Sequence, residues 1–283
     1  MGPAVWNCPH RLGTLVVGSL SLVLACTSAG RLPRVVPLPE DFRDQPTPVI
    51  VGYESAMRAI AKTLATNLGL PLGSVSLELY RDRASLAQGL VREGFSAVQA
   101  RRIAELMQGV GRPGKMMLNE TELAMDPWPR RFRLLAHELA HTCEYEATGG
   151  VRGSSEQWLR EGFAEWAAAE ILEAFRLTSV ANQRRRAVAS LGQHQDLSGL
   201  LTLETTEDWV KGHEDRDGPS TYDGAFLAVD LLVRRHGVDA MVRYFRLSAT
   251  TDEPGEAFRA AFGTPRDAFA GELATYLDEL RKR

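Results

Sequence analysis

The chain contains little cysteine, few aromatic residues and no marked excess of charge of either sign. Its 283 residues include three cysteines and 7% aromatic residues, with a formal net charge of −3. Without a basic excess, the chain has no electrostatic field that would attract nucleic acid, so we expect no nucleic-acid partner. Cys8 and Cys26 lie near the N-terminus, and Cys143 is then the only thiol left for the folded part. We therefore expect no disulfide there, and a buried packing role for Cys143.

Long apolar runs are also missing, and the one short run lies at the N-terminus. Residues 12–25 are mostly apolar, too short for an ordinary membrane-spanning helix and typical of a secretory signal. The run ends in Val23-Leu24-Ala25-Cys26, which resembles a bacterial lipoprotein signal, cleaved before a cysteine that then carries lipid. The resemblance implies a signal peptide over 1–25 and membrane anchoring through lipidated Cys26. Thr27 then favours the outer membrane. Ordinary secretion and an uncleaved anchor are the alternatives.

Prolines and hydrophobic periodicity divide the rest of the chain. Five prolines between residues 31 and 48 predict an extended tether over 26–48, followed by one domain over 49–283. Period-2 alternation predicts strands at 75–80 and 115–119, and helical spacing predicts helices at 53–68 and 96–107. The later predicted helices cover 179–191, 220–236, 238–247, 254–262 and 265–280. The fold class is therefore α+β, mainly α, with a small mixed α/β lobe up to about residue 125 and a helical lobe after it.

The most informative motif is His137-Glu138-Leu139-Ala140-His141. Two histidines four residues apart on a helix project from one face, so both imidazoles can reach a single zinc ion. Glu138 sits about 100° around the helix, where it can reach a metal-activated water but is poorly placed to be a ligand. A cap at Asp126, with Pro127 in the first helical position, and a stop at Gly149-Gly150 predict the helix itself. The alternative interpretation is a pair of packed helix histidines.

A carboxylate follows twenty residues after His141, in the segment Trp158-Leu159-Arg160-Glu161-Gly162-Phe163-Ala164. A second helix here, with a capping-box pattern at Ser154 and Gln157, could return across the first helix. His137, His141 and Glu161 would then hold one Zn²⁺ ion and leave a fourth position open for water, as in catalytic zinc sites. Glu138 would accept a proton from that water and later pass it to the leaving amine.

These two segments resemble the gluzincins, the HExxH metallopeptidases with a glutamate as third ligand, and in particular the broad peptidase MA-like group. The resemblance covers about residues 110–246. It implies a zincin-like domain, one zinc ion per chain held by His137, His141 and Glu161, and Glu138 as general base. The segment around Glu161 is also similar to the aminopeptidase branch. The Gly-x-Met-Glu-Asn signature that binds a substrate amine has no counterpart here, so we do not expect that type of aminopeptidase.

Further residues are candidates for supporting roles. Glu165 lies one turn after Glu161, where gluzincins often hold a zinc histidine with a carboxylate; the alternative is a solvated helix carboxylate. Tyr222, at the start of a predicted helix, is a candidate donor to the oxyanion of the tetrahedral intermediate, or else an aromatic anchor for that helix. His213 is a weaker candidate donor in a segment, 211–218, that is predicted to be a loop. Residues 115–119 either pair with extended substrate beside the cleft or form a simple packed strand.

Three functions remain open from the sequence. The first is an exported, lipid-anchored zinc peptidase that hydrolyses peptide or protein substrates. The second is a zincin-like binding or assembly module of the cell envelope without catalysis, which the missing substrate-anchor signature motivates. The third is hydrolysis of a non-peptide amide, which the same zinc chemistry permits. Substrate identity and oligomeric state do not follow from the sequence.

Overall fold

Four short strands form a mixed sheet in the N-terminal part of the chain. The structure is a computed structural model that describes residues 32–192, 197, 199–215 and 218–282, all of which belong to one compact unit. The strands are β1 (Arg34–Pro37), β2 (Ser76–Tyr80), β3 (Gly109–Arg112) and β4 (Lys115–Asn119). Their order is β1-β2-β4-β3. β2 and β4 run parallel, and the two outer pairs are antiparallel, so β1 and β3 are the edge strands.

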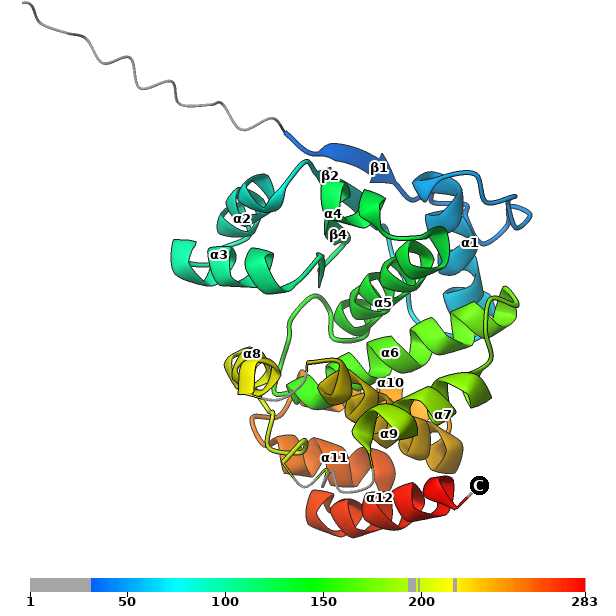
Figure 1. Cartoon of the computed structure of the whole chain (residues 1–283), viewed down its shortest axis with the longest axis vertical. Helices are drawn as coiled ribbons and strands as arrows, with labels where there is room; N and C mark the ends of the chain where they lie inside the picture. The colour runs from blue at the N-terminus through cyan, green and yellow to red at the C-terminus, as the bar shows by residue number, and fades with distance from the viewer. Residues whose placement is uncertain (1–31, 193–196, 198, 216–217, 283) are drawn as a thin grey trace, which may run out of the picture. The chain divides into compact units, whose positions relative to one another are not determined.

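Helices make up most of the remaining chain (Figure 1), so the described fold is α+β and mainly α, as predicted. In the N-terminal part they are α1 (Tyr53–Thr66), α2 (Arg83–Arg92), α3 (Ala97–Leu106) and α4 (Glu120–Met125). After β4 and α4 come α5 (Trp128–Ala147), α6 (Gln157–Ala174), α7 (Val180–Leu191), α8 (Thr206–Asp215), α9 (Gly218–His236), α10 (Val238–Ser248), α11 (Pro254–Phe262) and α12 (Arg266–Arg281).

α6 lies at the centre of the helical part, between α5 and α9 (Figure 1). Neighbouring helices cover α6 on both sides, and residues 157–169 are therefore all buried. Gly162 allows the close approach of α9: a Cβ on this residue would lie 2.3 Å from the carbonyl oxygen of Ala225. α5 packs in turn against α1 and against strands β3 and β4. This layering holds α5 and α6 against each other and brings β3 alongside α5.

The proline-rich segment differs from the expected tether over its described part. Arg34–Pro37 forms β1, paired with β2, and Val36, Leu38 and Phe42 are buried in the core. The physical reason is that Val36 and Leu38 lie on the same side of an extended chain and can bury their side chains together, although prolines flank them. The folded unit therefore includes residues ahead of position 49. The signal peptide, Cys26 and Thr27 lie outside the described residues.

Element boundaries differ from the predicted ones at three places near the metal motif. Pro127 is the N-cap of α5 rather than its first residue, and Glu156, not Ser154, is the N-cap of α6. α8 continues to Asp215, so most of the segment predicted as a loop around position 213 is helical. Elements α2, β3 and α4 were not expected from the sequence. Within the described part of the chain, no helix has the length and apolar character needed to cross a membrane.

Candidate metal centre

Two histidines on one face of α5 form the base of the site. His137 and His141 are one helical turn apart, with ring centroids 4.8 Å from each other, and the Nε2 atoms of the two rings are 3.2 Å apart. Both residues are buried, at 7% and 8% exposure. Imidazoles are seldom this buried without a partner that satisfies their nitrogens. The helix face therefore aims two nitrogen ligands at one point.

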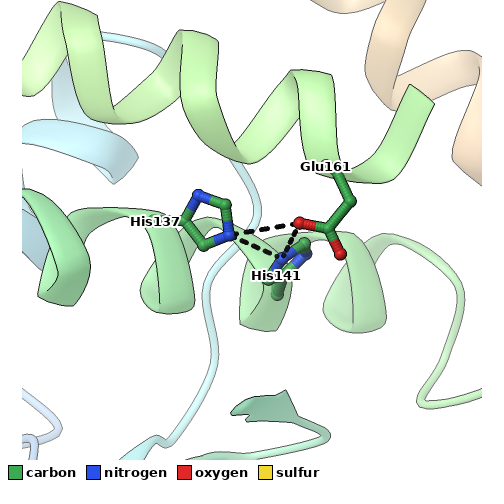
Figure 2. A group of neighbouring side chains, drawn as sticks. All are labelled: His137, His141 and Glu161. Carbon is green, nitrogen blue, oxygen red and sulfur yellow. Dashed lines mark hydrogen bonds and ion pairs between the residues drawn. The ribbon is translucent and has the colours of Figure 1, made fainter. Parts of the chain in front are cut away.

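Glu161 on α6 completes the set (Figure 2). Its Oε2 atom lies 3.3 Å from Nε2 of His137 and 3.7 Å from Nε2 of His141. The three residues form the only group of this kind found among the described residues, and all three are buried. The crossing of α5 and α6 thus brings together residues that are twenty or more positions apart in the sequence.

The spacing and chemistry of these three atoms fit a zinc ion. Zinc bonds of about 2.0–2.1 Å in tetrahedral geometry place neighbouring ligand atoms about 3.3 Å from each other. The three observed separations are 3.2, 3.3 and 3.7 Å. Two nitrogens and one oxygen suit zinc and related transition metals, whereas Mg²⁺ and Ca²⁺ prefer all-oxygen sites. The group can therefore hold a metal ion, and its donor set suits a transition metal better than Mg²⁺ or Ca²⁺.

Each histidine also has a carboxylate at its second ring nitrogen. Nδ1 of His137 lies 3.0 Å from Oε1 of Glu165, one turn beyond Glu161 on α6. Nδ1 of His141 lies 3.2 Å from both oxygens of Glu144, which is fully buried. A carboxylate at this nitrogen keeps the proton there, so that Nε2 remains free to bind a metal, and it makes the imidazole more basic. The structure thus places Glu165 where the sequence suggested and adds Glu144.

Arginines in turn neutralise these two outer carboxylates. Arg133 forms an ion pair with Glu165, and Arg160 lies 3.0 Å from Oε2 of Glu144. Glu161 has no guanidinium partner: its second oxygen, Oε1, accepts a hydrogen bond of 2.6 Å from Nε2 of Gln157. Glu138 is also buried, at 4% exposure, and forms no ion pair with an arginine among the described residues. Glu138 and Glu161 are therefore two buried carboxylates without an arginine partner in the described part of the chain. A divalent cation would neutralise their two negative charges.

The raised pKa values of the two histidines also indicate that the site stabilises positive charge. Burial opposes a charge on His137, but its contacts with Glu161 and Glu165 outweigh burial and raise the pKa to about 9. Burial opposes a charge on His141 as well, and the carboxylates of Glu144 and Glu161 raise its pKa well above the ordinary value. Positive charge is thus stabilised at this point. A metal ion that binds here has to displace protons from the histidines, so its binding should release protons.

Glu138 lies between α5 and strand β3. Burial raises the pKa of its carboxyl group, while the charges of His137 and His141 oppose that rise. Two glycines make the close packing of β3 on this helix feasible. A Cβ on Gly109 would lie 3.0 Å from Oε1 of Glu138, and one on Gly111 would lie 2.5 Å from Cβ of His141. The strand backbone therefore runs directly past Glu138 and the metal-binding group.

A cavity of about 430 Å³ opens over this group. His137, Glu138, His141 and Glu161 all contribute to its wall. Apolar side chains of Ile103, Met107, Val110, Trp209 and Val210 line part of the remaining wall. The group thus adjoins a space in which a ligand could reach it, a feature of catalytic rather than closed structural zinc sites.

Tyr222 on α9 reaches this cavity. Its ring centroid lies 6.0 Å from that of His137 and 5.0 Å from that of Trp209, and its hydroxyl donates to Sδ of Met107 at 3.6 Å. Burial, followed by the negative charge of Glu161, raises the pKa of Tyr222 well above its ordinary value, so the hydroxyl stays protonated. The side chain of the other candidate donor, His213, lies outside the described part of the structure.

Strand β4 does not border the cavity with a free edge. It is hydrogen-bonded to β2 on one side and to β3 on the other, so residues 115–119 have no backbone groups available for substrate. The prediction of a substrate-pairing strand at this position is therefore wrong, and the packed-strand alternative holds. The strand that lines the cavity at the edge of the sheet is β3, through Gly109, Val110, Gly111 and Arg112.

Three residues of the site were missed in the sequence. Glu144, Gln157 and Arg160 contact His141, Glu161 and Glu144, respectively. A signal was present for two of them, because Glu144 follows His141 by three positions and Gln157 precedes Glu161 by four on the same helix face. Arg160 carries no such local signal, since its partner lies on another helix. Cys143 is buried, at 1% exposure, as expected for a packing residue.

Comparison with known proteins adds no assignment to this geometry. No family model matches the chain, and neither a curated protein nor a solved structure matches it.

Proposed function

We propose that this protein is a zinc-dependent peptidase of the gluzincin type, related to the peptidase MA-like group. One observation carries the proposal. Three buried side-chain atoms of His137, His141 and Glu161 are spaced like zinc ligands and face a cavity whose wall also includes Glu138. A purely structural zinc site would have a fourth protein ligand and no adjoining cavity. The combination of an open position and a neighbouring carboxylate supports hydrolysis over a binding module.

In this proposal, the chain's own residues hold the ion and move one proton. His137, His141 and Glu161 hold zinc, with Glu165 and Glu144 orienting the two imidazoles. Bound zinc would polarise the substrate carbonyl and make a water molecule acidic at neutral pH. Glu138 takes one proton as the water oxygen adds to the carbonyl carbon. The same proton then moves to the amine nitrogen as the carbon–nitrogen bond breaks, leaving a carboxylic acid and an amine.

Strand β3 is the element that we propose to hold the substrate backbone. It is an edge strand, it lines the cavity, and its glycines bring its backbone next to Glu138. An extended peptide can add to such an edge through main-chain hydrogen bonds, which bind any sequence and leave specificity to the side chains nearby. The absence of a Gly-x-Met-Glu-Asn signature fits cleavage that does not require a free amino terminus.

The proposal is tested by metal content and cleavage measured together. The purified full chain should contain about one zinc per molecule, because it has one complete three-ligand group among its described residues. It should cleave members of a broad peptide library, lose that activity to a chelator, and recover it with added zinc. A zinc-loaded protein that cleaves no peptide contradicts the proposal. Binding of an envelope protein that survives Glu138→Gln would then favour the assembly module, and turnover of other amides alone would favour a different hydrolase.

We predict that Tyr222→Phe lowers kcat by about 10²- to 10³-fold and leaves KM and zinc content nearly unchanged. The phenol is proposed to donate to the oxygen that becomes negative in the transition state, so its loss affects that state alone. Phenylalanine keeps the ring contacts with Trp209 and His137. Steady-state kinetics on one peptide, with zinc analysis of the same preparation, measures the effect. A kcat close to that of the wild type would leave Tyr222 as a packing residue.

The location outside the cytoplasm is part of the same proposal and rests on the sequence alone. The signal-like segment before Cys26 supports export, and lipid on that cysteine would hold the domain at the cell envelope.

A further inference from the structure

The wall of the cavity is chemically different on its two sides. Near His137 it is aromatic and apolar, with Met107, Trp209 and Tyr222. On the side of His141 and Glu161 it contains three arginines: Arg112, Arg152 and Arg160. Positive charge is thus concentrated at one end of this cavity, in a chain whose net charge is −3. Such focusing inside a concave surface attracts ligands of opposite charge.

Arg160 is already neutralised, whereas the other two arginines are not. Arg160 pairs with the buried carboxylate of Glu144 and lies over the ring of Tyr145 at 4.8 Å. Arg112 contacts only neutral groups in the described part: its guanidinium lies 5.0 Å from the ring centroid of Phe95 and 3.4 Å from the hydroxyl of Tyr145. Ring stacking positions a guanidinium but does not neutralise it.

Arg152 lies in the connection between α5 and α6, and it is half-buried. Its described hydrogen bond runs to the hydroxyl of Thr206, which itself donates to Oε1 of Gln157 at 3.3 Å. Gln157 holds Glu161, so this chain of contacts links Arg152 to the metal-binding group. None of the side chains that Arg152 contacts in the described residues is a carboxylate. The guanidinium therefore lies beside the site without a described carboxylate in direct contact, and the more distant charges of Glu144 and Glu161 act on it.

We infer that Arg112 and Arg152 form a subsite for a carboxylate of the substrate, which makes the site selective for acidic peptides. This inference rests on the proposed function. Guanidinium groups bind carboxylates through paired hydrogen bonds, and a partly dehydrated cavity strengthens them. Arg112 directly follows Gly111, the strand residue packed against His141. With a strand rise of about 3.3 Å per residue, the recognised carboxylate lies within about two residues of the hydrolysed bond.

The carboxylate can belong to an acidic side chain or to the free carboxyl terminus of a peptide, and matched substrates separate these sources. The first set contains one pair of peptides for each of the two positions on either side of the cleaved bond, and the members of a pair differ only by Glu or Gln at that position. A second pair has the same sequence with a free or an amidated carboxyl terminus. We expect kcat/KM to be about 10- to 100-fold higher for the acidic member of one pair, because hydrogen bonds to charged groups contribute that much.

Variants of the full chain assign this preference to the two arginines. The Arg112→Gln/Arg152→Gln double variant should cleave both members of a pair equally well. Arg152→Lys, in an otherwise unchanged chain, should keep part of the preference, because a point charge remains. Arg259→Gln on α11 is the matched control: it removes the same charge from an exposed position that is not part of the cavity wall, and it should leave the preference intact. Thermal melts check that each variant is folded.

Binding measured without turnover separates this inference from the proposed function. The zinc-loaded Glu138→Gln protein should bind the acidic peptide more tightly than its neutral partner, and the arginine substitutions should abolish the difference. If no peptide is cleaved but this binding difference is found, the subsite stands and the peptidase proposal fails. If peptides are cleaved without any preference for a carboxylate, or if the preference survives the double substitution, the subsite is wrong and the peptidase proposal is unaffected.

Discussion

The Glu138→Gln protein is expected to lose about 10²- to 10⁴-fold of kcat while it keeps its zinc and its fold. Glutamine has the same shape as glutamate, but its amide cannot accept the proton that the attacking water must lose. Glu138 is buried and lies against Gly109, and an isosteric replacement preserves this packing against strand β3. The measurement is single-turnover and steady-state cleavage of one peptide, with metal analysis of the same sample.

A matched control is available on the same helix. Glu146 is an exposed carboxylate of α5 and does not line the cavity, so Glu146→Gln should retain wild-type kcat. Hydrolysis at the wild-type rate by a fully metal-loaded Glu138→Gln protein would remove Glu138 from the mechanism. It would also show that the carboxylate beside the metal-binding group has another role.

The second large effect is expected for Glu161→Ala, which should weaken zinc binding by more than about 100-fold. Loss of an outer partner of a zinc histidine already costs about 10- to 100-fold in affinity, and Glu161 is itself one of the three proposed ligands. Its removal also takes away one of the two carboxylates that no arginine neutralises. Competition with a chromogenic chelator measures the affinity, and elemental analysis after dialysis measures the occupancy.

Glu170→Ala provides the comparison for Glu161→Ala. Glu170 lies on the same helix but is not part of the metal-binding group, so its replacement should leave zinc content unchanged. Full zinc occupancy of the Glu161→Ala protein after dialysis would exclude Glu161 as a ligand. The search for the third ligand would then turn to Glu165, which already lies 3.0 Å from Nδ1 of His137.

Two sources of positive charge meet in this cavity and have separate consequences. A bound divalent cation would neutralise the negative charges of Glu138 and Glu161, whereas Arg112 and Arg152 would remain available for the substrate. Loss of the metal should therefore abolish cleavage of every peptide. Loss of the two arginines should lower kcat/KM for acidic peptides to about the value for their neutral partners. This separation allows the catalytic and the specificity roles to be tested independently.

Local sequence patterns were sufficient for several of the helices and for the histidine pair. Helical spacing predicted α1 and α7 to within two residues at each end, and the spacing of His137 and His141 placed both on one face of α5. These features depend on neighbours three or four positions away, whose relative placement is set by the helix itself. Helix spacing places Glu165 one turn after Glu161, and the resemblance to gluzincins added the prediction that its carboxylate holds one of the two histidines.

Features that join distant segments did not follow from the sequence. The edge of the sheet is the clearest example. The four residues of β3, two of them glycines, carry no strand signal, and the sequence leaves open whether β4 pairs with substrate or is simply packed. Glycine weakens a strand pattern, but here it allows the backbone to lie against Glu138 and His141. The segment around β1 was likewise expected to be a tether, because pairing with β2 cannot be read from its own residues.

By itself, the sequence determined which residue types are present at helical spacing: two histidines and a glutamate in one motif, and a further glutamate twenty positions later. Only the tertiary structure decided that α6 crosses α5 so that Glu161 lies 3.3 Å from His137, and that Arg133 and Arg160 neutralise the outer carboxylates. It alone placed Tyr222, Arg112 and Arg152 around one cavity. The physical reason is that a helix sets the geometry of residues within one or two turns. The geometry between helices depends on how whole apolar faces pack, and no single motif encodes that packing.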